Sequence, residues 1–128
     1  VASMDEKGEI LNAKIAEYTK AIIDGRPSFH ISLVIDVSPN CDCHGENDVP
    51  VVPDIGMFAS FDPVALDMAC AEAVLKAPVM AGSILDEVEH THGDHFTDIA
   101  PNTAWKTQLI HGEKIGIGTM QYELVEVK

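Results

Sequence analysis

Basic residues are scarce in this sequence, which has 8 Lys and Arg against 21 Asp and Glu and a net charge of −13. Nucleic acid and anionic membrane surfaces are bound through clustered Lys and Arg, so neither is an expected partner. Aromatic residues make up only 5% of the chain, so aliphatic side chains must fill the core. No apolar run approaches the roughly 20 residues that span a bilayer. Both standard Gly-rich phosphate-binding patterns are also missing.

Cysteine is scarce as well, with three residues at Cys41, Cys43 and Cys70. An odd number that includes a Cys-x-Cys pair is a poor disulfide framework. We therefore expect the reducing environment of the cytoplasm. The length of 128 residues suits one domain, 1–128.

Hydrophobic periodicity predicts an α/β fold with a small mixed or parallel sheet flanked by helices. The first helix carries an apolar stripe, and the first strand has one strongly apolar face. Between the two apolar strands lies a loop rich in Cys and Asp, 38–53, which is longer than compact domains usually keep without a use. The expected helices are 5–24, 63–76, 83–89 and 104–114, and the expected strands are 29–37, 55–60 and 122–127.

The loop contains the sequence Cys41-Asp42-Cys43-His44. Thiolate and imidazole are good ligands for zinc and for iron, and two thiols one residue apart can turn to the same side. A nearby carboxylate would complete a tetrahedral site. The sequence thus predicts a zinc or iron site at Cys41–His44, with three carboxylates as further candidates: Asp36, Asp48 and Asp54.

A second group of metal-binding side chains is His90-Thr91-His92-Gly93-Asp94-His95. Its pattern, His-x-His-x-Asp-His, resembles the metal motif of the metallo-β-lactamase family over these six residues. An acidic stretch precedes it here in place of an apolar strand, and only Asp98 and His111 could supply further ligands. Two interpretations stay open, a second metal cluster at His90, His92, Asp94 and His95 or a solvated polar loop.

Two aspartates frame the start of the second predicted helix. Asp62 before Pro63 is a good N-cap, which is a sufficient structural role. Asp67 is the odd charge in an otherwise apolar helix, where a carboxylate needs a hydrogen-bonding partner or a metal. Asp67 is therefore predicted to be either a buried hydrogen-bond hub or a site carboxylate, and Cys70 on the same helix a small core residue.

Three strings in this chain resemble the DUF362 family of iron–sulfur center proteins, and the ends Trp105–Leu109, Gly116–Gly118 and Tyr122–Leu124 look like that family's C-terminus. The strings are Ile35–Cys43, Val51–Ser60 and Asp62–Asp67. The resemblance implies that the chain is the C-terminal part of such a protein. Six of the candidates fall within its strings: Asp36, Cys41, Cys43, Asp54, Asp62 and Asp67.

Family members often carry a ferredoxin-like segment with two Cys-rich motifs just upstream of this region. The resemblance thus places 4Fe–4S clusters in that segment, which the present sequence lacks. It also implies a partner, either a redox protein or the ferredoxin-like segment itself. A 4Fe–4S cluster takes four cysteines, so the three present here should not build one.

Three functional hypotheses follow. The first is an iron–sulfur-associated or metal-binding redox module whose loop thiols are ligands or a redox pair. The second is a metal-dependent hydrolase that uses His90, His92, Asp94 and His95. The third is a structural or interaction domain with inert thiols. The sequence names no substrate and no reaction.

Overall fold

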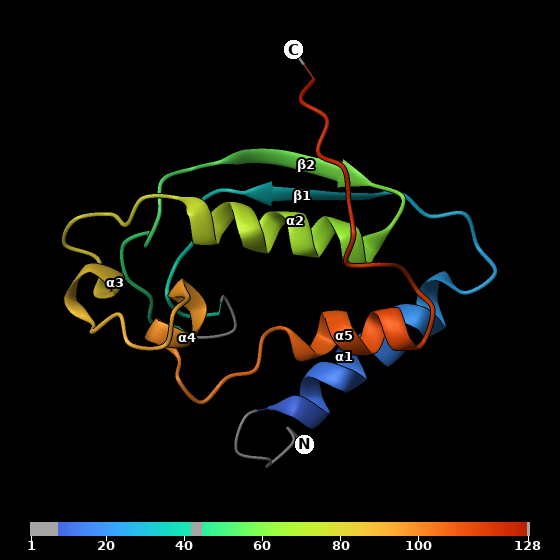
Figure 1. Cartoon of the computed structure of the whole chain (residues 1–128), viewed down its shortest axis with the longest axis horizontal. Helices are drawn as coiled ribbons and strands as arrows, with labels where there is room; N and C mark the ends of the chain where they lie inside the picture. Colours follow the sequence, from blue (N-terminus) through green and yellow to red (C-terminus); the bar gives the residue numbers. More distant parts are fainter. Residues whose placement is uncertain (1–7, 42–44, 128) are drawn as a thin grey trace.

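A computed structural model describes residues 8–41 and 45–127 of the chain. Figure 1 shows the sheet on one side of α2, and α1 and α5 side by side on the other. Helix α2 contacts both strands, and α1 contacts α5. The predicted α/β class is confirmed. In chain order the elements of the described residues are α1 (Glu9–Ile23), β1 (His30–Val34), β2 (Gly56–Ser60), α2 (Pro63–Lys76), α3 (Ile84–Glu87), α4 (His95–Ile99) and α5 (Thr107–Lys114).

The sheet has two antiparallel strands, with His30 opposite Ser60 and Val34 opposite Gly56. Parallel neighbours need a crossover connection, usually a helix, whereas the described parts of the segment between these strands contain no helix. The expected strand 122–127 is absent, because residues 121–127 have no regular secondary structure. Tyr122 instead donates a hydrogen bond to Glu72 Oε2 of α2 at 2.5 Å. The final segment is therefore fixed to a helix and not to the sheet.

Helix α2 is the central element, and the sequence predicted its bounds. The Asp62 carboxylate accepts hydrogen bonds from the backbone N–H groups of Val64 and Ala65, both at 2.9 Å, and Pro63 takes the first helical position. These contacts satisfy amide groups that a helix start leaves without partners. As expected for a helix that is apolar on most sides, six of its residues are buried: Val64, Ala65, Leu66, Met68, Ala69 and Val74.

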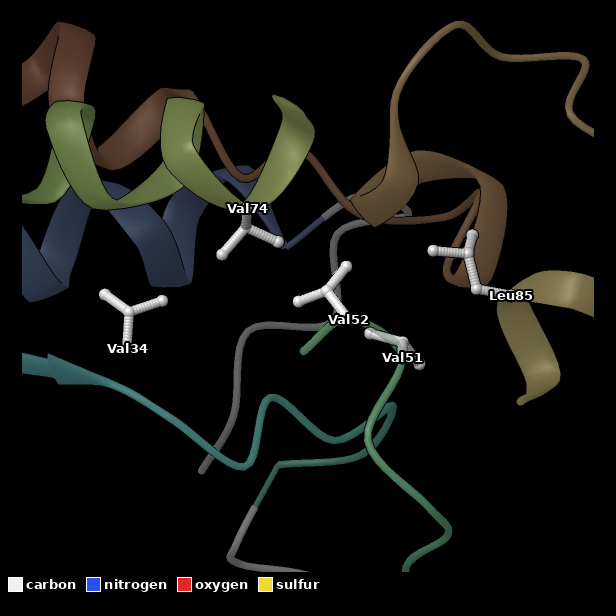
Figure 2. Close-up of a cluster of buried hydrophobic side chains, with 5 residues drawn as sticks. All are labelled: Val34, Val51, Val52, Val74 and Leu85. Carbon is white, nitrogen blue, oxygen red and sulfur yellow. The ribbon is translucent and has the colours of Figure 1, made fainter. Parts of the chain in front are cut away.

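Two clusters of buried apolar side chains lie along α2. Figure 2 shows the larger one, in which Val34 of β1 and Val74 of α2 meet Val51, Val52 and Leu85. The smaller cluster joins Val64 and Met68 to Leu109 of α5. Val52 and Leu85 are fully buried, so the end of the loop 38–53 is anchored in the core.

Helix α1 does not pack against the protein with the apolar stripe that its sequence predicts. Its predicted apolar stripe, Leu11, Ile15, Tyr18 and Ile22, is between 43% and 71% exposed. Its buried residue is Ala16, and a polar side chain joins α1 to the segment before α5. Asn12 Nδ2 donates to the carbonyl of Ala104 at 2.9 Å.

The stretch 90–102, where no helix or strand was expected, contains the short helix α4, which Asp94 caps through the N–H of Thr97 at 2.8 Å. Ser83, at the start of the expected helix 83–89, caps α3. In the part of the chain that the structure describes, no helix combines the length and the apolar character needed to cross a bilayer.

Candidate functional site

A cavity of about 610 Å³ lies between α2 and the layer that contains α1 and α5. Its size falls within the range of about 300–1,000 Å³ that is usual for sites binding small molecules. The lining is mostly apolar. Large apolar side chains reach it from four helices and from the segment before α5: Leu11, Val74, Phe96, Trp105 and Leu109.

One face of α2 forms a wall of this cavity, with Asp67, Cys70, Ala71 and Val74 at positions i, i+3, i+4 and i+7. Asp67 is exposed as a whole residue, yet the apolar surroundings strip water from its carboxyl group. This desolvation raises the pKa of Asp67, and the nearby His30 partly offsets the rise. An acid with a raised pKa in a cavity wall is a typical feature of a binding or catalytic site.

Cys70 is less suited to chemistry. Burial raises the pKa of its thiol, the charge of Asp67 raises it further, and a hydrogen bond with Ser32 acts in the opposite direction. The thiolate is the reactive form of cysteine, so Cys70 stays a neutral thiol near pH 7. It also packs against the larger core cluster, in line with its predicted role as a small core residue.

The cysteine loop begins at the rim of the same cavity, because Val37, Ser38 and Pro39 line it. Cys41 follows two residues later, and two residues of chain span at most about 7 Å. The side chain of Cys41 is exposed. Cys43 and His44, the other predicted ligands, lie outside the described residues.

Two asparagines close this loop, and the sequence analysis did not single them out. Asn47 Nδ2 donates to Ser38 Oγ at 2.8 Å and to the carbonyl of Asn40 at 3.1 Å. Asn47 Oδ1 accepts from the N–H of Asn40 at 3.2 Å. The pair brings residues 40 and 47 together, so the two ends of the segment that carries Cys41 lie close to each other. The side-chain signal was present in the sequence, because Asn frequently bonds nearby backbone groups in turns.

Two of the three candidate carboxylates of this region, those of Asp54 and Asp48, accept hydrogen bonds from nearby backbone N–H groups. Asp54 Oδ1 accepts from the N–H of Asp36 at 2.9 Å, and Asp36 has a left-handed backbone with φ 49°. Asp48 Oδ1 accepts from the N–H of Val49 at 2.7 Å. All three aspartates are exposed. Among the side chains of residues 8–41 and 45–127, no three of His, Cys, Asp and Glu are grouped as a metal site.

The histidine group is arranged around Asp98, whose side chain is only 3% exposed. Asp98 accepts from the N–H of His92 at 2.8 Å, and the Nδ1 atoms of His90 and His92 lie 3.2 and 3.3 Å from its two carboxylate oxygens. The backbone hydrogen bond from His92 is the largest effect that lowers the pKa of Asp98, against the influence of burial. The carboxylate is therefore charged at neutral pH.

The other two members of this group point to different partners. Asp94 caps α4, and its second oxygen accepts from the Thr97 hydroxyl at 2.9 Å. His95 Nε2 donates to the carbonyl of Ala77 at 3.2 Å. The structure thus brings His90 and His92 together on Asp98, while Asp94 and His95 hold α4 in place.

Asp62 has a second contact that ties the C-terminal segment to α2. Its Oδ2 accepts from the N–H of Thr119 at 2.8 Å. Gly118 lies so close that a β-carbon there would overlap the Asp62 carboxylate. Asp62 therefore has a structural role at both ends of its carboxylate.

These features define an α/β domain with an apolar cavity, one carboxylate of raised pKa in the cavity wall, and the start of the cysteine loop at the rim. A family model described as a domain of unknown function (DUF362) matches residues 2–72, which is more than half of the chain. The chain belongs to the DUF362 family. No curated protein and no solved structure gives a significant match.

Proposed function

We propose that this chain is the small-molecule-binding module of a redox-associated DUF362 protein. Its ligand would be a small, mostly apolar molecule with one hydrogen-bond donor or positive charge. The observation that carries this proposal is the cavity of about 610 Å³ with the Asp67 carboxyl group in its apolar wall. Aromatic and aliphatic walls favour an apolar body, and a single polar group fixes its orientation.

Asp67 is the residue assigned to that polar contact. Desolvation raises its pKa, because the partly apolar surroundings leave the ionised form with less of the water that would normally stabilise it. A donor or a cation in the cavity would replace this water and favour the carboxylate. Asn12 and Gln108 also line the cavity and offer further amide groups.

Trp105, the single tryptophan of the chain, lines the cavity and provides an intrinsic reporter. The test is a titration with N-phenyl-1-naphthylamine, an apolar fluorophore with one N–H donor, followed by quenching of Trp105 emission. We expect saturable one-to-one binding. Ala71→Phe should remove it by filling the cavity, whereas the exposed helical variant Ala21→Phe should bind like the wild type. Linear quenching without saturation, or equal binding by both variants, would contradict the proposal.

The second proposed function is a zinc or iron site, or a redox pair, at Cys41, Cys43 and His44. The supporting observation is the pair of hydrogen bonds between Asn40 and Asn47, which holds the ends of the segment 41–46 together. A 4Fe–4S cluster does not fit this chain, because it would need four thiolates and Cys70 is a raised-pKa thiol packed in the core. No reaction step is assigned to the loop.

Elemental analysis of protein purified without an affinity tag tests this second proposal. About one equivalent of zinc or iron is expected, and Cys41→Ser/Cys43→Ser should lose it. The control is His90→Ala/His92→Ala, which should keep it. Metal lost only from the histidine variant would favour the hydrolase hypothesis instead, and wild-type protein free of metal would refute both.

A further inference from the structure

The face of the sheet opposite α2 is apolar and uncovered. Side chains alternate between the two faces of a strand, so His30, Ser32 and Val34 lie on one face and Ile31 and Leu33 on the other. Ile31 pairs with Ala59 and Leu33 with Met57 across the ladder. Among the elements of the described chain, α2 alone contacts the strands, and Figure 1 shows it on one side of the sheet.

Six large apolar side chains make up this surface, which we name the sheet patch. One end is closed by Phe29 and Phe61, whose rings meet edge to face with centroids 4.9 Å apart. The members are between 44% and 79% exposed: Phe29, Ile31, Leu33, Ile35, Met57 and Phe61. None of them is charged, although the chain as a whole carries −13.

The exposed area of the sheet patch shows whether it is large enough to form a protein interface. If a large side chain offers about 200 Å² when fully exposed, the six together expose roughly 700 Å² of apolar surface. The largest apolar patch on a typical monomer is about 300–600 Å². A standard protein interface takes about 800 Å² from each partner. The sheet patch therefore has nearly the size that one partner contributes to a stable complex.

We propose that the sheet patch packs against the sheet patch of a second copy of this chain. An antiparallel ladder can stack face to face on its own symmetry mate at about 10 Å, and a two-fold axis makes one patch self-complementary. The patch offers no charge with which a basic or acidic partner could be recognised. The remaining surfaces of two copies are both acidic and repel each other, so the dimer tightens as salt screens that repulsion.

The test is the mass of the chain in solution, measured by sedimentation equilibrium at 50 mM and 500 mM NaCl. We expect twice the monomer mass of 13.8 kDa and tighter association at the higher salt. Leu33→Glu and, on the other strand, Met57→Glu should each weaken the dimer at least about tenfold, because a charge would be buried without a partner. Both side chains are exposed in the single chain, and circular dichroism verifies that each variant keeps its helices.

Tyr18→Glu is the matched control, since Tyr18 belongs to the exposed stripe of α1 on the other side of the molecule. It should dimerise like the wild type. A wild-type monomer at 100 µM chain and 500 mM NaCl, or a dimer that Tyr18→Glu disrupts and both sheet variants keep, would overturn the proposal. Association that weakens with salt would also overturn it.

Discussion

The carboxylate of Asp62 makes two separable contributions to stability, and two substitutions can distinguish them. Oδ1 caps α2, and Oδ2 holds the C-terminal segment through Thr119. Asp62→Ala removes both. Loss of an N-cap costs about 1 kcal/mol, and loss of the second hydrogen bond costs about 1 kcal/mol more. Unfolding should therefore become easier by about 2 kcal/mol, which lowers Tm by roughly 8 °C in a chain of this length.

Asp62→Asn isolates the second contribution, because an asparagine oxygen still caps the helix while its NH₂ group cannot accept from Thr119. Its Tm should fall by roughly 4 °C. Gly118→Ala should also lower Tm, since the new β-carbon would displace the carboxylate. The measurement is thermal unfolding followed by circular dichroism, with the exposed Glu126→Gln as the control for lost charge. Equal Tm values for Asp62→Ala and Asp62→Asn would refute the separation between the helix cap and the hydrogen bond to Thr119.

Three further predictions concern the rest of the fold. The hydrogen bond to Glu72 raises the pKa of Tyr122 to about 12, so the stability that this bond contributes is complete below pH 10 and is lost as the pH rises through about 12. In Tyr18→Phe protein, where Tyr122 is the remaining tyrosine, the absorbance at 295 nm should titrate near 12. Adding Glu72→Gln should lower that midpoint. Leu85→Ala should cost about 2–5 kcal/mol in urea unfolding because Leu85 is fully buried; a loss below 1 kcal/mol would contradict the described core. Asp36→Val should cost about 1–2 kcal/mol and Asp36→Gly little, since φ is 49° there; equal unfolding midpoints would refute this.

Sequence patterns located the helices and strands whose signals are local. Asp62 and Pro63 marked the start of α2. The antiparallel pairing of β1 and β2 was harder to predict from the sequence, because the direction of pairing depends on the structure of the segment that connects the two strands. The predicted strand 122–127 failed for a different reason. Apolar and polar residues alternate only weakly in this segment, and the structure instead joins it to α2 through the hydrogen bond between Tyr122 and Glu72.

Periodicity also cannot tell which side of an amphipathic element is covered. The stripe with Leu11 and Ile15 on α1 and the stripe with Ile31 and Leu33 on β1 were both recognised as apolar, yet both are exposed. A sequence pattern identifies the apolar face of a helix or strand. Only the packing of the other elements shows whether that face is covered. For the same reason the sequence did not foresee the sheet patch.

The candidate site was predictable in parts. Asp67 was singled out as an unusual charge in an apolar helix, and the structure places it in the wall of the cavity. The cavity itself was not foreseen, because its lining comes from segments nearly a hundred residues apart, such as Leu11 and Leu109. Asp98 was noted only as a spare ligand, and its burial between two histidines is a tertiary feature.

We expect the cavity between α2 and the α1–α5 layer to bind a small apolar molecule. An NMR titration of methyl-labelled protein with N-phenyl-1-naphthylamine tests it most directly. We expect saturable shifts for methyl groups of Leu11, Val74 and Leu109, which line the cavity, with those of Leu33 unchanged. Shifts confined to Leu33 and its neighbours in the sheet patch, with the cavity methyl groups unaffected, would contradict the claim.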